Sequence, residues 1–105
     1  MDETQAAAAD LETADNPERR RWEVRSGGEV IAYAEYRLRP GRVVFTHTVV
    51  EPQFEGRGVG SRLARIVLDA AVERGDRITP VCPFIRAYIK RHPEYMPSVD
   101  MPDQS

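Results

Sequence analysis

The sequence contains a single cysteine, Cys82, so no disulfide can form within the chain. It has only two histidines, and no cluster of His, Cys and carboxylate residues has the spacing of metal ligands, so we expect no bound metal. No apolar run approaches the ~20 residues that cross a bilayer. Residues 1–15 are acidic, whereas a signal peptide is basic and then apolar. These absences argue against disulfide-stabilised secreted proteins and membrane proteins, and they favour a cytoplasmic protein.

The chain is short and its charge is unevenly distributed. Its 105 residues are enough for one small domain, and 41% hydrophobic with 30% charged residues is an ordinary soluble composition. The formal net charge is −2, but residues 1–18 contain six carboxylates and no Lys or Arg, so the rest of the chain carries +4. A mildly basic domain suits a phosphate-bearing ligand. The excess is too small to indicate nucleic-acid binding, and we expect no nucleic-acid partner.

Hydrophobic patterning predicts an α+β domain between two less structured ends. We expect residues 1–18 to be a disordered acidic tail, residues 19–96 to form the domain and residues 97–105 to be a loose end. The order β-β-β-α-β-α follows from the alternating and helical periodicities. The expected strands are residues 22–25, 29–38, 43–51 and 77–81, and the expected helices are residues 58–74 and a segment from Pro83 to the His92-Pro93 stop. The first three strands form an antiparallel meander, and the fourth is parallel to the third because a helix connects them.

Side-chain alternation assigns faces to these elements. In the third strand the residues expected to share one face are Val43, Phe45, His47 and Val49. In the second helix the residues expected on the buried side are Phe84, Ile85, Tyr88 and Ile89.

A glycine-rich turn between the third strand and the first helix is the most informative stretch. Gly56, Gly58 and Gly60 alternate with other residues, and helical periodicity begins directly after them. Glycine lets backbone N–H groups crowd together, and a helix N-terminus adds unpaired donors and partial positive charge, which together form a seat for a phosphate or pyrophosphate. The spacing is not the G-x-G-x-x-G of a dinucleotide fold, and no Lys follows as in a P-loop. A plain turn that starts a helix is the alternative interpretation.

Three segments together resemble a short GNAT-like N-acetyltransferase family: HTVV at residues 47–50, EGRGVGSRLA at residues 55–64 and CPFIRAYIKRHPEY at residues 82–95. The resemblance implies a minimal GNAT-like acyl-CoA N-acyltransferase fold with acetyl-CoA as cosubstrate. Gly58 and Gly60 fill the two small positions of the family's pyrophosphate loop, whereas Glu55 stands where the family usually has Gln or Arg. An acidic side chain does not favour a pyrophosphate, so we expect Glu55 to point outward while main-chain donors bind.

The resemblance also implies which residues hold coenzyme A. In the family, the strand before the loop offers backbone N–H groups to the pantetheine arm and the thioester carbonyl, and Val49 and Val50 occupy the matching positions. Such fixed donors stabilise an oxyanion, although both valines could also be ordinary strand core. The other residues of the expected binding set are Glu55, Gly56, Arg57, Gly58, Val59, Gly60, Ser61, Cys82, Phe84 and Tyr88.

Three side chains are candidates for catalysis, and each has a structural alternative. Tyr88 lies four residues before the helix stop, where many GNAT enzymes have the Tyr that protonates the departing thiolate; it could instead be a core aromatic. Cys82 precedes a helix whose N-terminus lowers a thiol pKa, so it could accept the acetyl group covalently or be a small buried residue. His47 is a candidate general base or a packed histidine, with Glu51 and Glu35 as rivals.

The resulting prediction is an acetyl-CoA-dependent N-acetyltransferase in which an amine attacks the thioester directly. The alternative is a module that holds coenzyme A or a protein partner without turnover. Residues 26–29 join two strands directly, which leaves no room for the helix pair that walls the acceptor site in longer GNAT enzymes, and small ligands need an enclosed site. We therefore expect a protein lysine or N-terminal amine as acceptor, or a homodimer that completes the site, and no membrane partner.

Overall fold

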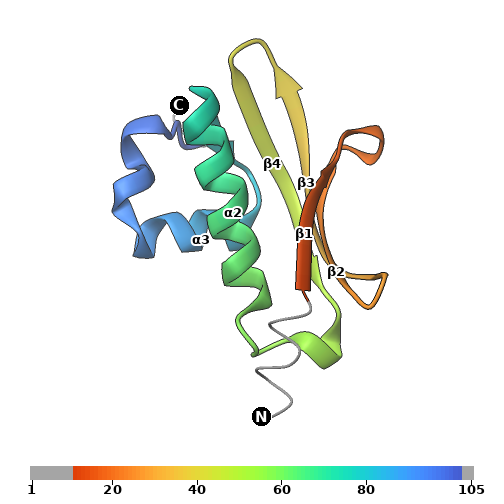
Figure 1. Ribbon diagram of the computed structural model, residues 1–105. Helices are drawn as coiled ribbons and strands as arrows, with labels where there is room; N and C mark the ends of the chain where they lie inside the picture. The colour runs from red at the N-terminus through yellow and green to blue at the C-terminus, as the bar shows by residue number, and fades with distance from the viewer. Residues whose placement is uncertain (1–10, 103–105) are drawn as a thin grey trace.

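Five strands form one sheet whose spatial order follows the chain, β1-β2-β3-β4-β5. The computed structural model describes residues 11–102. Strands β1 to β4 are antiparallel and β5 is parallel to β4, and Figure 1 shows both α-helices on one face of this sheet. The strands are β1 Leu11–Asn16, β2 Arg21–Ser26, β3 Glu29–Arg39, β4 Arg42–Val50 and β5 Arg77–Pro80; the α-helices are α2 Val59–Arg74 and α3 Pro83–Arg91; the 3-10 turns are η1 Pro17–Arg19, η2 Pro52–Phe54 and η3 Pro93–Ser98.

The α+β architecture predicted from the sequence is confirmed, as are the meander and the parallel last strand. Short turns join β2, β3 and β4, and α2 provides the crossover from β4 to β5. Helix α2 packs its apolar stripe against the small side chains of Ala32 and Ala34, which are at most 1% exposed. Full burial of Leu63 and Leu68 in this stripe contributes about 2 kcal/mol each. This packing fixes the N-terminus of α2 next to the end of β4.

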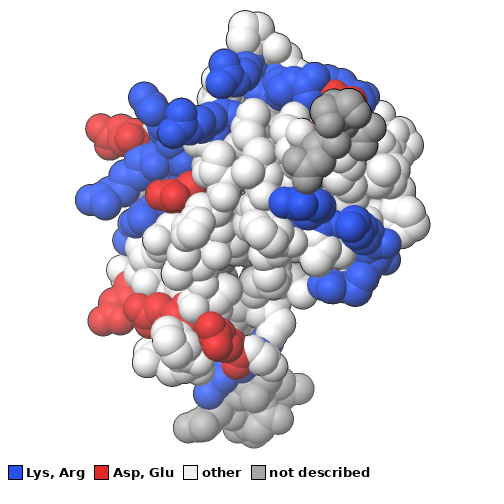
Figure 2. Space-filling model, turned by 180° about the vertical axis from the view of Figure 1, so that it is seen from behind, with Lys and Arg blue, Asp and Glu red and all other residues white. Residues whose placement is uncertain are grey.

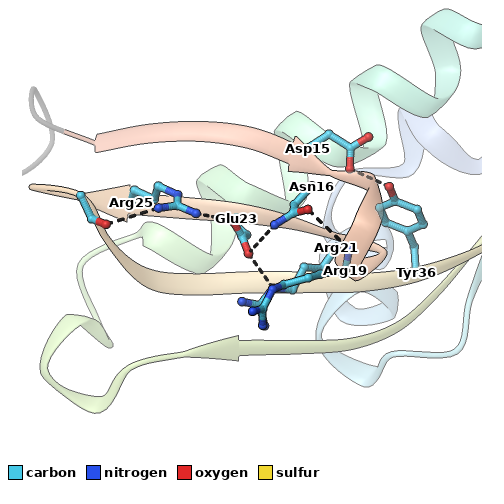
Figure 3. A network of polar contacts seen from close by, with 8 residues as sticks. Asp15, Asn16, Arg19, Arg21, Glu23, Arg25 and Tyr36 are labelled. Atoms are coloured by element: carbon cyan, nitrogen blue, oxygen red, sulfur yellow. Dashed lines mark hydrogen bonds and ion pairs between the residues drawn. The ribbon is translucent and has the colours of Figure 1, made fainter.

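The expectation of a tail over residues 1–18 is wrong in its second half, because Leu11–Asn16 forms β1 along the edge of β2. This strand is held by polar contacts as well as by packing. The Tyr36 hydroxyl donates a hydrogen bond to the Asp15 carboxylate over 2.6 Å (Figure 3). A strand that is anchored through its polar side chains lacks the apolar alternation on which the sequence analysis depended. Residues 1–10 lie outside the described residues.

A polar cluster around Glu23 lies on the sheet face opposite the helices (Figure 3). Arg21 and Arg25 donate to its carboxylate over 2.7 and 2.9 Å, and Asn16 of β1 donates over 3.3 Å. Glu23 is only 4% exposed. Burial by itself would raise the pKa of Glu23, but the hydrogen bonds from these three residues outweigh it, and the pKa lies below its ordinary value. The charged carboxylate therefore joins β1 to β2.

Residues 97–102 pack against the domain and are not the loose end expected from the sequence. Val99 is 8% exposed, and the Asp100 N–H donates to the backbone of β5 over 2.8 Å. The Asp100 carboxylate pairs with the Arg77 guanidinium over 2.7 Å, and hydrogen bonds with this and a second arginine lower the pKa of Asp100 to about 2. The expected loose end is thus wrong up to residue 102, and residues 103–105 lie outside the described part.

A β-bulge in β4 changes which of its side chains face the helices. Glu35 lies opposite His47, whereas the next residue, Tyr36, lies opposite Phe45. Thr46 is therefore an extra residue in β4, and the side-chain alternation is reset at this point.

The reset places Thr48 and Val50 on the helix-facing side of the sheet, because they lie opposite the two buried alanines of β3. His47 and Val49 consequently point to the other face. The prediction that these two residues share a face with the buried residues at the start of β4 is wrong, since it assumed an unbroken alternation.

Candidate functional site

A cavity of about 390 Å³ opens where β4 ends and α2 begins. This volume lies within the ~300–1,000 Å³ typical of small-molecule sites. Its wall combines the end of β4, the η2 turn, the glycine loop, the first turn of α2 and the start of α3. The lining residues are Thr48, Val50, Phe54, Glu55, Gly56, Gly58, Val59, Gly60, Ser61 and Phe84.

The first turn of α2 presents backbone donors to this cavity. Gly58 is the N-cap residue with φ 79°, in the left-handed region that favours glycine, and no side chain caps the helix. The first helical bond runs from the Arg62 N–H to the Gly58 carbonyl over 3.0 Å, so the N–H groups of Val59, Gly60 and Ser61 precede the helical ladder. Together with the partial positive charge of the helix N-terminus, these donors are suited to an anion.

Gly60 allows a close approach between α2 and α3. A Cβ atom at this position would lie 2.7 Å from Cζ of Phe84, much closer than the ~3.5–4.0 Å of an ordinary carbon contact. Phe84 is 38% exposed, so the prediction that it lies on the buried side of α3 is wrong. It lines the cavity instead, because the missing side chain of Gly60 leaves room for its ring.

Glu55 and Arg57 carry opposite charges around the loop. Glu55 is exposed and lines the cavity mouth, and its backbone N–H donates to Pro52 over 3.2 Å. The Arg57 guanidinium lies over the Phe54 ring, 5.7 Å from the ring centroid. Arg57 is therefore beside the cavity and does not line it.

Strands β4 and β5 separate at the inner end of the cavity. Their pairing ends at Phe45, whose carbonyl also accepts a hydrogen bond from the Cys82 N–H over 2.8 Å. Backbone groups alternate sides along a strand, and the Glu51 N–H donates toward β3. The N–H and C=O groups of Thr48 and Val50 therefore point away from β3, into the space that β5 has left.

The Cys82 thiol lies behind the cavity wall. It is 2% exposed, and its Sγ donates to Oγ1 of Thr48 over 3.2 Å. Because the Thr48 oxygen accepts from the thiol, its own O–H can donate elsewhere, and no residue between 11 and 102 accepts from it. Thr48 thus offers a proton donor to the part of the cavity where the two strands separate.

Tyr88 lines a second hollow, of about 380 Å³, between α2 and α3. Its ring stacks on His92 with 4.1 Å between the ring centroids, and burial raises the pKa of its hydroxyl, so the phenol stays protonated at neutral pH. The other residues that line this hollow are Ser61, Arg62, Arg65 and Arg91. Ser61 belongs to both hollows, so a positively charged surface adjoins the N-terminus of α2.

The cavity brings together most of the residues expected to hold the cofactor. The members of that set in its wall are Val50, Glu55, Gly56, Gly58, Val59, Gly60, Ser61 and Phe84. Cys82 and Tyr88 lie behind and beside it, whereas Val49 faces the opposite side of the sheet. His47 is exposed opposite Glu35, so its predicted place in the cleft is wrong, and the bulge at Thr46 is the cause.

The sequence analysis missed Thr48, Phe54 and the three arginines of the second hollow. Thr48 stands between His47 and Val49, and only the bulge decides that its side chain faces the cavity. Two of these arginines could have been predicted to lie together. Arg62 and Arg65 are three residues apart in the sequence and therefore share one face of α2.

Comparison with known proteins agrees with this geometry. Residues 21–99 match the profile of the GCN5-related N-acetyl-transferases. The chain belongs to this family. The solution NMR structure of a GCN5-like protein from Staphylococcus aureus has the same fold, with a TM-score of 0.70 at 20% identity over 91% of this chain and 94% of that one. A search among curated proteins gave no match.

Membership in the GCN5-related N-acetyltransferases confirms the resemblance read from three sequence segments, and the chemistry of this family is acetyl transfer. Within residues 11–102 of this family member, no helix is long and apolar enough to cross a membrane. The same stretch contains no group of three or more His, Cys, Asp or Glu residues placed to hold a metal ion.

Proposed function

We propose that this GCN5-related N-acetyltransferase uses acetyl-CoA as donor and acetylates an amine on a protein or peptide. The observation that carries the proposal is that one cavity connects two sets of backbone groups. At one end, the first turn of α2 offers N–H donors that suit a pyrophosphate. At the other end, the edge of β4 offers the backbone groups of Thr48 and Val50 to the amides of a pantetheine arm.

The second hollow suits the remaining phosphate of coenzyme A, which is carried on the ribose. Arg62, Arg65 and Arg91 bring three guanidinium groups to a surface that adjoins the α2 N-terminus at Ser61. Guanidinium groups bind phosphate oxygens through paired hydrogen bonds. A ligand with its pyrophosphate on α2 can therefore reach these arginines with its third phosphate.

The reaction forms an amide bond and breaks the thioester C–S bond. A neutral amine attacks the carbonyl carbon, negative charge develops on the carbonyl oxygen, and the departing thiolate finally gains the proton that the amine loses. Donors fixed beside the oxygen lower this barrier. The Thr48 hydroxyl, oriented by the Cys82 thiol, and the Val50 N–H are the donors that the cavity offers at its inner end.

Direct attack fits this arrangement better than an acyl relay through Cys82. The thiol is 2% exposed and uses its proton in the bond to Thr48, so an incoming thioester meets Thr48 first. Tyr88, the other expected proton donor, lies in the neighbouring hollow next to Ser61. We assign Tyr88 to the wall of the cofactor site and Thr48 to the carbonyl.

A module that binds coenzyme A without turnover is the second candidate, and one observation favours it. Glu55, at the cavity mouth, is the only titratable side chain among the residues that line the cavity. Catalysis would therefore have to accept an amine that is already neutral or that loses its proton to water. This is feasible for an amine whose own pKa is low, such as an N-terminal α-amino group at ~7.7–8.0.

The acceptor side of the described chain is open. A single 3-10 turn connects β1 to β2, and two residues connect β2 to β3. Within the described chain, no helix pair therefore covers the sheet beside these connections (Figure 1). Small ligands are normally enclosed over most of their surface. A protein acceptor, or a second copy of the chain, would supply the missing wall.

The test combines calorimetry with a transfer assay. We expect coenzyme A to bind in the micromolar range, and thiol release from acetyl-CoA to require an added peptide with a free lysine or N-terminus. Acetylated peptide detected by mass spectrometry supports the enzyme. Binding without turnover across lysine peptides, free N-termini, polyamines and amino acids supports the non-catalytic module. Absence of coenzyme A binding by the folded protein contradicts both.

A further inference from the structure

A groove of about 420 Å³, separate from the cavity and from the second hollow, runs along an edge of β3. It lies on the far side of the domain from the first turn of α2. The residues that line it are Pro17, Arg20, Tyr36, Arg37, Leu38 and Arg39. Figure 2 shows Lys and Arg side chains gathered on the side of the molecule where η1 and the β3–β4 hairpin lie. The acetyl-transfer chemistry described above makes no use of this groove.

The edge of β3 is free here because β2 begins only at Arg21, opposite Glu35. Arg20 has φ 54°, and among residues 11–102 it is the one non-glycine residue in the left-handed region. Its N–H therefore donates to the Pro17 carbonyl over 3.1 Å and does not reach Tyr36, although the Tyr36 N–H still donates to the Arg20 carbonyl over 2.9 Å. Pairing with β2 goes no further along β3, so the carbonyl of Tyr36 and both backbone groups of Leu38 face the groove.

Three arginines line the groove, and Arg19 lines an adjoining hollow in which Glu35 is the one acidic residue. Within the described chain, no ion pair involves Arg19, Arg20, Arg37 or Arg39. Arg37 and Arg39 are two residues apart on one strand and so point to the same side of it. Leu38, between them, points to the other side and is 63% exposed. The edge therefore alternates cation, apolar residue and cation.

We propose that this edge binds an extended segment of a partner protein in which acidic and apolar residues alternate. The segment adds as a strand, its backbone pairing with Leu38 and with the carbonyl of Tyr36. Opposite residues in such a pair have Cβ atoms ~4.5–5.5 Å apart, so carboxylates at alternate positions meet Arg37 and Arg39 while an apolar side chain covers Leu38. The inference goes beyond acetyl transfer and does not depend on it.

The test is fluorescence anisotropy of a labelled peptide of alternating glutamate and valine, added to the full chain without acetyl-CoA. We expect saturable binding that weakens with salt, as exposed charge pairs do. A peptide of alternating lysine and valine should not bind. A peptide of alternating glutamate and proline should bind much more weakly, because proline has no N–H for the strand pair. Equal binding of the proline peptide would overturn the strand addition.

Arg39→Glu and Lys90→Glu form a matched pair of variants, since both reverse an exposed charge and Lys90 lies on α3, away from the groove. Arg39→Glu should raise the peptide Kd about tenfold and Lys90→Glu should leave it unchanged. Peptide binding should also slow amide hydrogen exchange at Leu38. Unchanged exchange there, or equal effects of the two variants, would refute the proposal. Tighter binding of a single-stranded oligonucleotide of the same length, lost in Arg39→Glu, would assign the groove to nucleic acid instead.

Discussion

The Cys82 thiol donates a hydrogen bond to the Thr48 hydroxyl over 3.2 Å, which joins the N-cap of α3 to the end of β4 that is no longer paired with β5. The donor is almost fully buried, whereas the acceptor lines the cavity. In the proposed reaction the two residues therefore differ in role: Thr48 touches the bound thioester, and Cys82 positions Thr48. Substitutions can separate these roles.

Thr48→Val removes the hydroxyl while keeping the shape of the side chain. We expect kcat to fall ~10²-fold with little change in the KM for acetyl-CoA, because a donor to developing negative charge acts mainly in the transition state. Thr48→Ser restores a hydroxyl and should recover most of the activity. Steady-state kinetics at saturating acceptor measure both variants. An unchanged kcat in Thr48→Val would remove Thr48 from the reaction.

Cys82→Ser keeps a donor at the position of the thiol, whereas Cys82→Ala removes it. We expect the serine variant to retain activity and the alanine variant to lose only about threefold to tenfold, less than Thr48→Val, because the thiol acts through orientation. Intact-protein mass spectrometry with acetyl-CoA and no amine should reveal no acetylated protein. An acetyl adduct that is absent from both Cys82 variants, together with inactivity of both, would instead establish the relay.

The sequence predicted the helices and inner strands well, because their signals are local. The apolar stripe of α2, the glycines that precede it and Pro83 at the start of α3 each follow from residue chemistry at fixed spacing. The glycine N-cap of α2 follows for the same reason, and its use as a pyrophosphate seat stays a prediction. The family resemblance added coenzyme A, which no periodicity could name.

The remaining errors have one kind of cause, since each depends on pairing with distant residues. The bulge at Thr46 arises from the register of β4 against β3. Because of it, the Thr48 side chain lines the cavity, whereas the side chains of His47 and Val49 point to the other face of the sheet. Strand β1 is held by side-chain hydrogen bonds, from Asn16 to Glu23 of β2 and from Tyr36 of β3 to Asp15. The C-terminal residues are held by an ion pair with Arg77 of β5. Each of these partners is seven or more residues away in the sequence, beyond the reach of local periodicity.

His47→Ala should leave the pH dependence of the rate unchanged, because His47 lies on the sheet face away from the cavity. Because no histidine lines the cavity itself, log kcat/KM should rise with pH up to the pKa of the acceptor amine and not level off near ~6.5, the ordinary pKa of histidine. The measurement is a rate profile on one peptide for both proteins. If the profile of the parent protein changes slope near pH ~6.5 and that of the variant does not, His47 acts as the base.

Gly60→Ala should weaken coenzyme A binding about tenfold or more, because the new methyl group would displace the Phe84 ring into the cavity. Adding Phe84→Leu removes the ring atom that is 2.7 Å from this position and should recover part of the affinity. Calorimetry on the two single variants and the double variant gives the coupling between the positions. Additive losses would mean that Gly60 and Phe84 act independently.

Gly58→Ala would test coenzyme A binding less clearly. Its φ of 79° strains any side chain at this position, so the fold itself would lose stability.

Glu23→Gln tests whether the polar cluster on the open sheet face stabilises the fold. The pKa of Glu23 is lowered in the folded state, so its contribution is present above the unfolded pKa of ~4.3 and is lost as pH falls through the folded pKa. We expect the substitution to cost about 2 kcal/mol of unfolding free energy at pH 7, the typical worth of hydrogen bonds to a charged group. The difference between the two proteins should shrink below pH 4, and urea unfolding at several pH values measures it.

Glu18→Gln, at an exposed position in η1, is the matched control and should leave the unfolding free energy at pH 7 unchanged. A Glu23→Gln protein as stable as the parent at pH 7 would show that β1 is held by packing and by the Asp15–Tyr36 bond without help from this carboxylate.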